Sequence, residues 1–167
     1  MTTDDLILQA LRSSTLSEEL RDSEIDALAN LIVVQEFKAR EPILKPGDEN
    51  NKLNDALLIL GSGEVEATVT SGGEKVTLHL LKPGDLAGII GFVGGSVTQI
   101  SATVEAKIDS KVLVLDRARF ETLLNTQPAI VYYIMRGIVR HVQGIVRRMN
   151  LQSAQMSNYI FKQGGRY

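Results

Sequence analysis

The sequence contains no cysteine. Disulfides, thiolate nucleophiles, cysteine zinc sites and iron–sulfur clusters are therefore excluded. Histidine is also scarce, because only His79 and His141 are present. A histidine metal site on a small β-barrel needs two or three histidines clustered on neighbouring strands, and a hydrolytic triad needs a base beside a nucleophile and a carboxylate. Neither pattern surrounds these two residues, so we expect no enzyme activity and no bound metal.

Long apolar runs are absent as well, since no stretch approaches the ~18 uninterrupted apolar residues of a membrane span. The N-terminal stretch MTTDDLILQALRSS has acids where a signal peptide needs basic residues. We therefore expect a cytoplasmic protein that does not contact membranes. Its 167 residues fit one domain.

Acidic residues are missing from the C-terminal part of the chain. None follows Glu121, whereas six basic residues do: Arg136, Arg140, Arg147, Arg148, Lys162 and Arg166. The net charge is −2, so residues 1–121 carry −8. Such asymmetry can mark a surface for nucleic acid or another acidic partner, or a basic helix packed on the acidic part of its own fold or of a second subunit. We favour self-association because no aromatic residues interleave the basic ones.

Short apolar or alternating runs dominate the middle of the chain and predict strands. Between the short helices expected before Val33 and the helix expected at 117–124, turn signals recur about every ten residues, which is typical of a β-sandwich or barrel. Lys75–Leu81 is expected to pair back across a hairpin turn with Val76, Leu78 and Leu80 inward. The predicted strand pieces are Val34–Ala39, Pro42–Leu44, Ala56–Leu60, Glu64–Thr70, Lys75–Leu81, Ile100–Val104 and Lys111–Leu115.

One long helix is predicted from Pro128 to about Asn158, because only two tolerable glycines interrupt this stretch. We accordingly divide the chain into residues 1–127, the helix 128–158 and a tail 159–167. The apolar arc of the helix covers nearly half its circumference, which is wider than one buried contact needs. Steps of three and four predict a dimer seam, although a single helix sunk in its own core is the alternative. The seam residues are Ile134, Ile138, Val142, Ile145 and Met149.

The stretch Gly84–Gly95, GDLAGIIGFVGG, has five glycines in twelve residues. It lacks the Gly-Lys-Ser/Thr of a P-loop, and it does not read GxGxxG. It belongs instead to a series of PILKPGD, LILGSGEVEA, LLKPGDLAGIIGF, ISATVEA and VLVLDRARFETLL. Over roughly residues 16–150 this series resembles the cyclic-nucleotide-binding domain, the sensor half of catabolite-activator-type transcription factors. The resemblance implies a mainly β jelly-roll (double-stranded β-helix) barrel, short N-terminal helices and a long C-terminal dimerisation helix.

The resemblance also implies a ligand cassette that begins with a short helix, whose glutamate accepts from the ribose and whose arginine pairs with the phosphate. Here Ile89 occupies the glutamate place and Ile100 the arginine place, and Ile145 and Val146 fall where base-contacting hydroxyls can sit. The polar recognition positions have become apolar, while the glycine frame is kept. The candidate pocket residues are Gly88, Ile89, Ile90, Gly91, Gln99, Ile100, Ser101, Ala102, Ile145 and Val146.

We therefore expect a stand-alone, homodimeric regulatory or sensor module that acts through a protein partner and binds neither cyclic AMP nor cyclic GMP in the usual way. No cofactor is expected beyond an unidentified small ligand. Three other hypotheses stay open: a scaffold whose pocket is filled by its own side chains, a cyclic-nucleotide site that uses Gln99, Ser101 and backbone N–H groups, and nucleic-acid binding through Arg136, Arg140 and Arg147. Only about nine residues follow Asn158, so we expect no helix-turn-helix and no direct reading of DNA.

Overall fold

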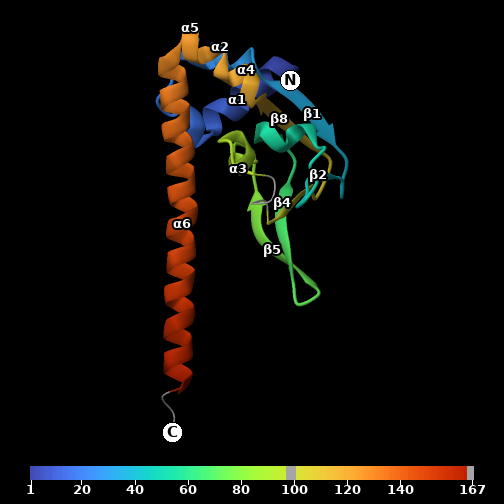
Figure 1. Cartoon of the computed structure of the whole chain (residues 1–167), viewed down its shortest axis with the longest axis vertical. Coiled ribbons are helices and arrows are strands. Elements are labelled where there is room, and N and C mark those ends of the chain that lie inside the picture. The colour runs from blue at the N-terminus through green and yellow to red at the C-terminus, as the bar shows by residue number, and fades with distance from the viewer. Residues whose placement is uncertain (97–100, 165–167) are drawn as a thin grey trace.

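The computed structural model describes residues 1–96 and 101–164 of the chain. It consists of a small β-barrel, a group of short helices at one end, and one long helix along its side (Figure 1). The elements are α1 (Thr3–Ser13), η1 (Thr15–Ser17), α2 (Asp22–Ala29), β1 (Val33–Phe37), β2 (Pro42–Leu44), η2 (Lys52–Asp55), β3 (Ala56–Ser62), β4 (Val65–Ser71), β5 (Glu74–Leu81), β6 (Leu86–Ala87), α3 (Ile89–Phe92), β7 (Thr103–Ala106), β8 (Ser110–Asp116), α4 (Arg117–Glu121), α5 (Leu123–Thr126) and α6 (Pro128–Gly164).

The strands form two antiparallel sheets of four strands each, in the orders β1-β8-β3-β6 and β2-β7-β4-β5. Strands that are distant in the sequence lie side by side in both sheets, as in β1-β8 and β2-β7. The two sheets enclose one apolar cluster and the helices pack over a second. The predicted fold class, a jelly-roll barrel with short N-terminal helices and a long C-terminal helix, is therefore confirmed.

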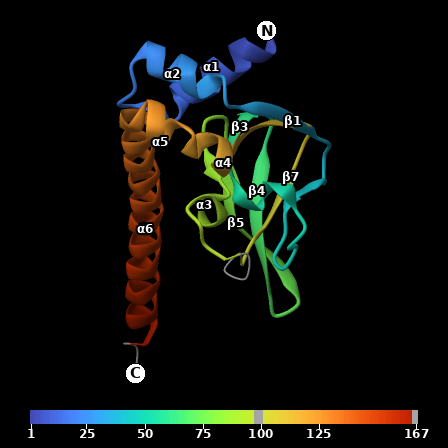
Figure 2. The same cartoon turned by 45° about the horizontal axis from the view of Figure 1, so that its top comes forward.

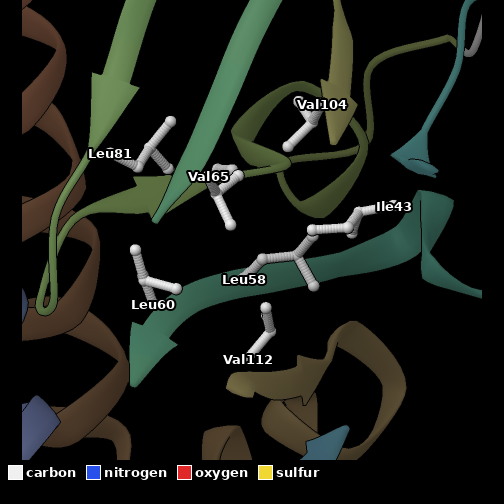
Figure 3. A pocket seen from close by; sticks show the side chains of 8 residues that line it. Ile43, Leu58, Leu60, Val65, Leu81, Val104 and Val112 are labelled. Carbon is white, nitrogen blue, oxygen red and sulfur yellow. The ribbon is translucent and has the colours of Figure 1, made fainter. Parts of the chain in front are cut away.

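Strand β3 is apolar throughout Ala56–Leu60 because both of its faces are buried. Leu57 and Ile59 belong to the cluster under the helices, whereas Leu58 and Leu60 belong to the barrel interior. Figure 3 shows Leu58 and Leu60 facing the other side chains of that interior. The void among them is only about 10 Å³, about the least space that holds a single water molecule. The interior of the barrel is thus filled by its own side chains.

The β4–β5 hairpin extends beyond the barrel (Figure 1). Strand β4 pairs with β7 over residues 65–68, so no third strand from residues 1–96 and 101–164 pairs with the hairpin tip. The prediction that Val76 and Leu78 face inward is wrong, because these side chains are 45% and 58% exposed. Leu81 is buried instead. The register of the β4–β5 pair shifts between Ala67 and Thr68, and such a bulge changes which side chains face the core.

The long helix α6 begins at Pro128, as expected, but ends at Gly164 rather than near Asn158. The segment assigned to a tail therefore begins inside the helix, because no helix-breaking residue lies between Asn158 and Gly164. Ile134 and Ile138 are 0% and 2% exposed and pack in the protein's own core. They cannot form a seam with a second helix, so the predicted dimer seam is wrong at these two positions.

Candidate functional site

An open cavity of about 730 Å³ lies among the cassette, the β4–β5 hairpin and α6. Its volume is in the range of small-molecule binding sites. The elements around it appear in Figures 1 and 2, where α3 and β5 lie on the side of the barrel toward α6. The lining residues are Leu44, Asn54, Ala67, Leu78, His79, Leu81, Leu86, Ala87, Gly88, Ile89, Ile90, Gly91, Ser101, Ala102, Val104, Ile145, Arg148, Met149 and Gln152.

Two glycines shape the cassette at this cavity. Gly88 caps the N-terminus of α3 at φ +76°, a left-handed conformation that favours glycine, and a Cβ there would lie 2.6 Å from the carbonyl oxygen of Ala56. At Gly91 a Cβ would lie 1.6 Å from the carbonyl oxygen of Asn54. No side chain fits at that separation, so the glycines bring α3 into direct backbone contact with η2 and the start of β3.

The side of α3 away from the cavity is held by α4. Arg117 Nη1 donates to the Gly91 carbonyl oxygen at 3.0 Å, and Arg117 Nη2 lies 3.4 Å from Asp55 Oδ1. The rings of Phe92 and Phe120 pack with their centroids 5.2 Å apart. These contacts fix the cassette backbone in place, so one wall of the cavity is preformed.

The position expected for a ribose-binding acid holds Ile89, which lines the cavity and packs partly against the core under the helices. Its side chain has no hydrogen-bond acceptor. Gln99 and Ile100, the other predicted cassette residues, lie outside the residues that the structure describes. Ser101 and Ala102 lie at the cavity, as do Gly88 and Ile90. Apart from Val146, the described residues of the predicted pocket therefore lie around one space.

The long helix contributes Ile145, Arg148, Met149 and Gln152 to the lining. These positions follow the i, i+3, i+4 and i+7 spacing of one helix face. Val146, predicted beside Ile145, is not among the described residues that line the cavity, because one residue turns the helix by 100° and leaves this side chain 48% exposed on another face. The same spacing counted from Ile145 would have found Arg148 and Gln152, which the sequence analysis did not select.

A polar cluster joins α6 to the barrel next to the cavity. His79 Nε2 lies 3.8 Å from Asp85 Oδ2. Burial lowers the pKa of His141 on α6, and the positive charges of Arg148 and His79 act in the same direction, whereas Asp85 opposes them. Within residues 1–96 and 101–164, no group of three or more histidine, aspartate or glutamate side chains could hold a metal ion.

The arginine stripe of α6 is partly used within the chain. Arg136 Nε lies 3.1 Å from Glu19 Oε1, and Arg140 pairs with both Glu18 and Glu19 beside η1. These pairs match the hypothesis of a basic helix packed on the acidic part of its own fold. Arg148 differs from them, since it lines the cavity and forms no ion pair with the residues that the structure describes.

The jelly-roll barrel, its cassette and the long helix together border a ligand-sized cavity, which is the arrangement of a ligand-binding domain. The family model described as the cyclic nucleotide-binding domain matches residues 34–127. The chain therefore belongs to the cyclic nucleotide-binding domain family, whose members are regulatory binding domains. None of the helices described in residues 1–96 and 101–164 is long and apolar enough to cross a bilayer.

Individual relatives agree with this assignment. The neuropathy target esterase sws of Drosophila virilis is 24% identical over 172 residues, which cover 98% of this chain and 11% of the esterase. This chain thus spans about a tenth of the length of that relative. A cyclic nucleotide-binding domain from Methylobacillus flagellatus KT superposes with a TM-score of 0.74 at 19% identity, covering 87% of this chain and 79% of that one. The catabolite activator protein of Thermus thermophilus superposes with a TM-score of 0.66 at 27% identity, covering 84% and 63%.

Proposed function

We propose that this chain is a regulatory module that responds to a small ligand other than cyclic AMP or cyclic GMP. The observation that carries the proposal is that the apolar side chain of Ile89 lines the cavity, since the sequence resemblance assigns this place to the family's ribose-binding acid. The cavity is open although the barrel interior is filled, which favours a ligand-binding module over a scaffold with a self-filled pocket.

Energies indicate how far cyclic-nucleotide affinity would fall. A hydrogen bond to a charged group contributes about 1.5–3 kcal/mol, and a buried polar group left without its partner costs about as much again. Ile89 removes the acceptor for the ribose, and Ile100 removes the cassette's own cation. Each 1.4 kcal/mol is a factor of ten in the dissociation constant. We therefore expect affinity several orders of magnitude below that of a site with both groups.

The alternative is a cyclic-nucleotide site in which Ser101 and backbone N–H groups replace the missing pair. Ser101 lies at the cavity, which is the observation in its favour. A thermal-unfolding measurement separates the two hypotheses, because a ligand that binds the folded state stabilises it by an amount that grows with the ratio of ligand concentration to dissociation constant. We expect micromolar cyclic AMP or cyclic GMP to raise the Tm by less than about 2 °C. A larger shift would favour the alternative.

We also propose that two copies of the chain pair through α6, along a seam different from the one first predicted. Exposed apolar residues recur on α6 at the a and d positions of a heptad, except that the polar Ser153 occupies one such position between Met149 and Met156. Their positions are Val139, Val142, Val146, Met149, Met156 and Ile160. All described residues of α6 from Asn150 onward are exposed, and an isolated helical segment of that length is marginal in water. A second copy of α6 would cover these residues. The protein partner and the cytoplasmic location stay predictions.

A further inference from the structure

We propose that the cavity beside α6 binds an amphipathic anion, with an apolar body against the barrel and a carboxylate or phosphate head at Arg148. This inference rests on the proposed function and names the ligand class of the same cavity. The barrel side of the lining is formed mainly by aliphatic side chains and glycine, which would contact an apolar body rather than a sugar. The aliphatic residues are Leu44, Ala67, Leu78, Leu81, Leu86, Ala87, Ile89, Ile90, Ala102 and Val104.

Two described lining residues can carry a positive charge, His79 on β5 and Arg148 on α6. Arg148 is the only permanently charged side chain among the described lining residues. Within the described part of the chain it lacks the carboxylate partner that Arg136 and Arg140 of the same helix have in Glu19. A guanidinium presents a planar fork of donors that matches carboxylate or phosphate. An anionic head is therefore the group that Arg148 fits.

The surroundings of Arg148 reinforce this polarity. His141 lies seven residues before it, two turns away on the same face of α6. Burial lowers the pKa of His141, Asp85 is the largest electrostatic influence and raises it, and Arg148 and then His79 lower it. An anion at Arg148 would offset the positive charge of this arginine. A neutral apolar molecule in the same cavity would only remove more water from His141.

The test is isothermal titration calorimetry on the full chain with decanoate, decyl phosphate, decanol and decylamine, each below its micelle-forming concentration. We expect decanoate or decyl phosphate to bind at least about tenfold more tightly than decanol, and decylamine to bind more weakly than decanol. The comparison of decanoate with decyl phosphate identifies which head group the site prefers. Binding of decanol equal to that of both anions would overturn the proposal.

Two variants locate the anion. Arg148→Gln should raise the dissociation constant of the preferred anion at least about tenfold and leave that of decanol unchanged. Arg147→Gln is the matched control, because Arg147 is the adjacent exposed arginine and is not among the described lining residues. Equal effects of the two substitutions would overturn the assignment to Arg148. Both positions are exposed, so the variants are expected to fold, and far-UV circular dichroism checks this.

The pKa of His141 provides a second measurement, which does not depend on the affinity of the ligand. We expect NMR titration to show that the anion raises the pKa of His141, whereas decanol leaves it unchanged or lowers it. A fall of the His141 pKa on anion binding would contradict a head group at Arg148. Cyclic AMP is the last arm: if it binds and decanoate does not, the proposed function fails together with this inference. If neither anion nor cyclic AMP binds, only this inference fails.

Discussion

Two glycines of α6 offer a matched test of how the long helix docks on the rest of the protein. Gly137 and Gly144 are seven residues apart, so they occupy equivalent positions relative to the proposed seam, on the side of the helix opposite to it. A Cβ at Gly137 would lie 2.9 Å from both Cα and the carbonyl oxygen of Leu16, whereas a Cβ at Gly144 would have no atom within 4 Å. The two positions therefore differ mainly in their contact with η1.

Replacing either glycine by alanine favours the helix by about 0.8–1.0 kcal/mol. At Gly144 nothing opposes this gain, so Gly144→Ala should raise the free energy of unfolding by about 0.5–1 kcal/mol. At Gly137 the new methyl group meets backbone atoms of η1, and overpacking of this kind costs about 1–3 kcal/mol. Gly137→Ala should therefore be less stable than Gly144→Ala by about 1–3 kcal/mol.

Urea unfolding followed by far-UV circular dichroism measures both values, at one protein concentration because dimerisation would make stability concentration-dependent. The midpoint should rise for Gly144→Ala and fall well below it for Gly137→Ala, with similar slopes. Equal stabilisation of the two variants would refute the docking of α6 on η1 at Leu16. A fall in stability for Gly144→Ala would refute the open surroundings of that residue.

Three further predictions concern the seam, the helix–barrel contact and the cassette. Val146→Glu should convert a dimer to a monomer in light scattering, because it places like charges opposite each other at the seam; a dimer unchanged by it would contradict the seam. Because the pKa of His141 is lowered in the folded state, the unfolded chain binds a proton more readily. The free energy of unfolding should therefore fall as the pH drops from 7.5 through about 6.5 to 5.5, and it should fall less in His141→Gln. An equal fall in the two proteins would contradict this prediction. Gly91→Ala should lower the urea midpoint more than any substitution above, because its Cβ would overlap the Asn54 carbonyl oxygen; a midpoint near that of the unaltered protein would contradict the close approach.

Much of the barrel could be predicted because its signals are local. Turn sequences such as Lys45–Asp48 and Lys82–Asp85 end strands through the conformations of proline and glycine, and the apolar run Ala56–Leu60 indicates a strand buried on both faces. The β4–β5 hairpin was placed correctly in the chain, but the orientation of Val76 and Leu78 was not. That orientation depends on a bulge at Leu78 of β5, where two residues of β5 oppose one of β4, and on where β7 stops pairing. The alternation of polar and apolar residues in the hairpin predicts neither feature.

The long helix shows the same division between local and tertiary information. Its wide apolar arc led us to expect two buried contacts, one with the rest of the chain and one with a second helix. Part of the arc packs in the protein's own core and part lines the cavity, whereas the contact with a second helix stays a prediction. Which residue serves which contact depends on how the helix is rotated against the barrel. Ile134 and Ile138 are buried in the protein's own core, whereas the exposed residues of the proposed seam include Val139 and Val146. Arg148 was counted only as a charge, although its spacing from Ile145 places it on the cavity face.

The faces of α6 also bear on how a ligand in this cavity would be sensed. The cassette wall is held by Arg117 and by the close contacts of Gly88 and Gly91, so it has little freedom to respond. The opposite wall is α6, and its Met149 lines the cavity while also lying in the exposed heptad pattern. A ligand shifts an equilibrium only through contacts that differ between two states. Met149 belongs to both the cavity lining and the proposed pairing surface, so a change in its contacts with a ligand would also change its contacts with a second helix. We therefore expect the distal half of α6 to transmit occupancy of the cavity.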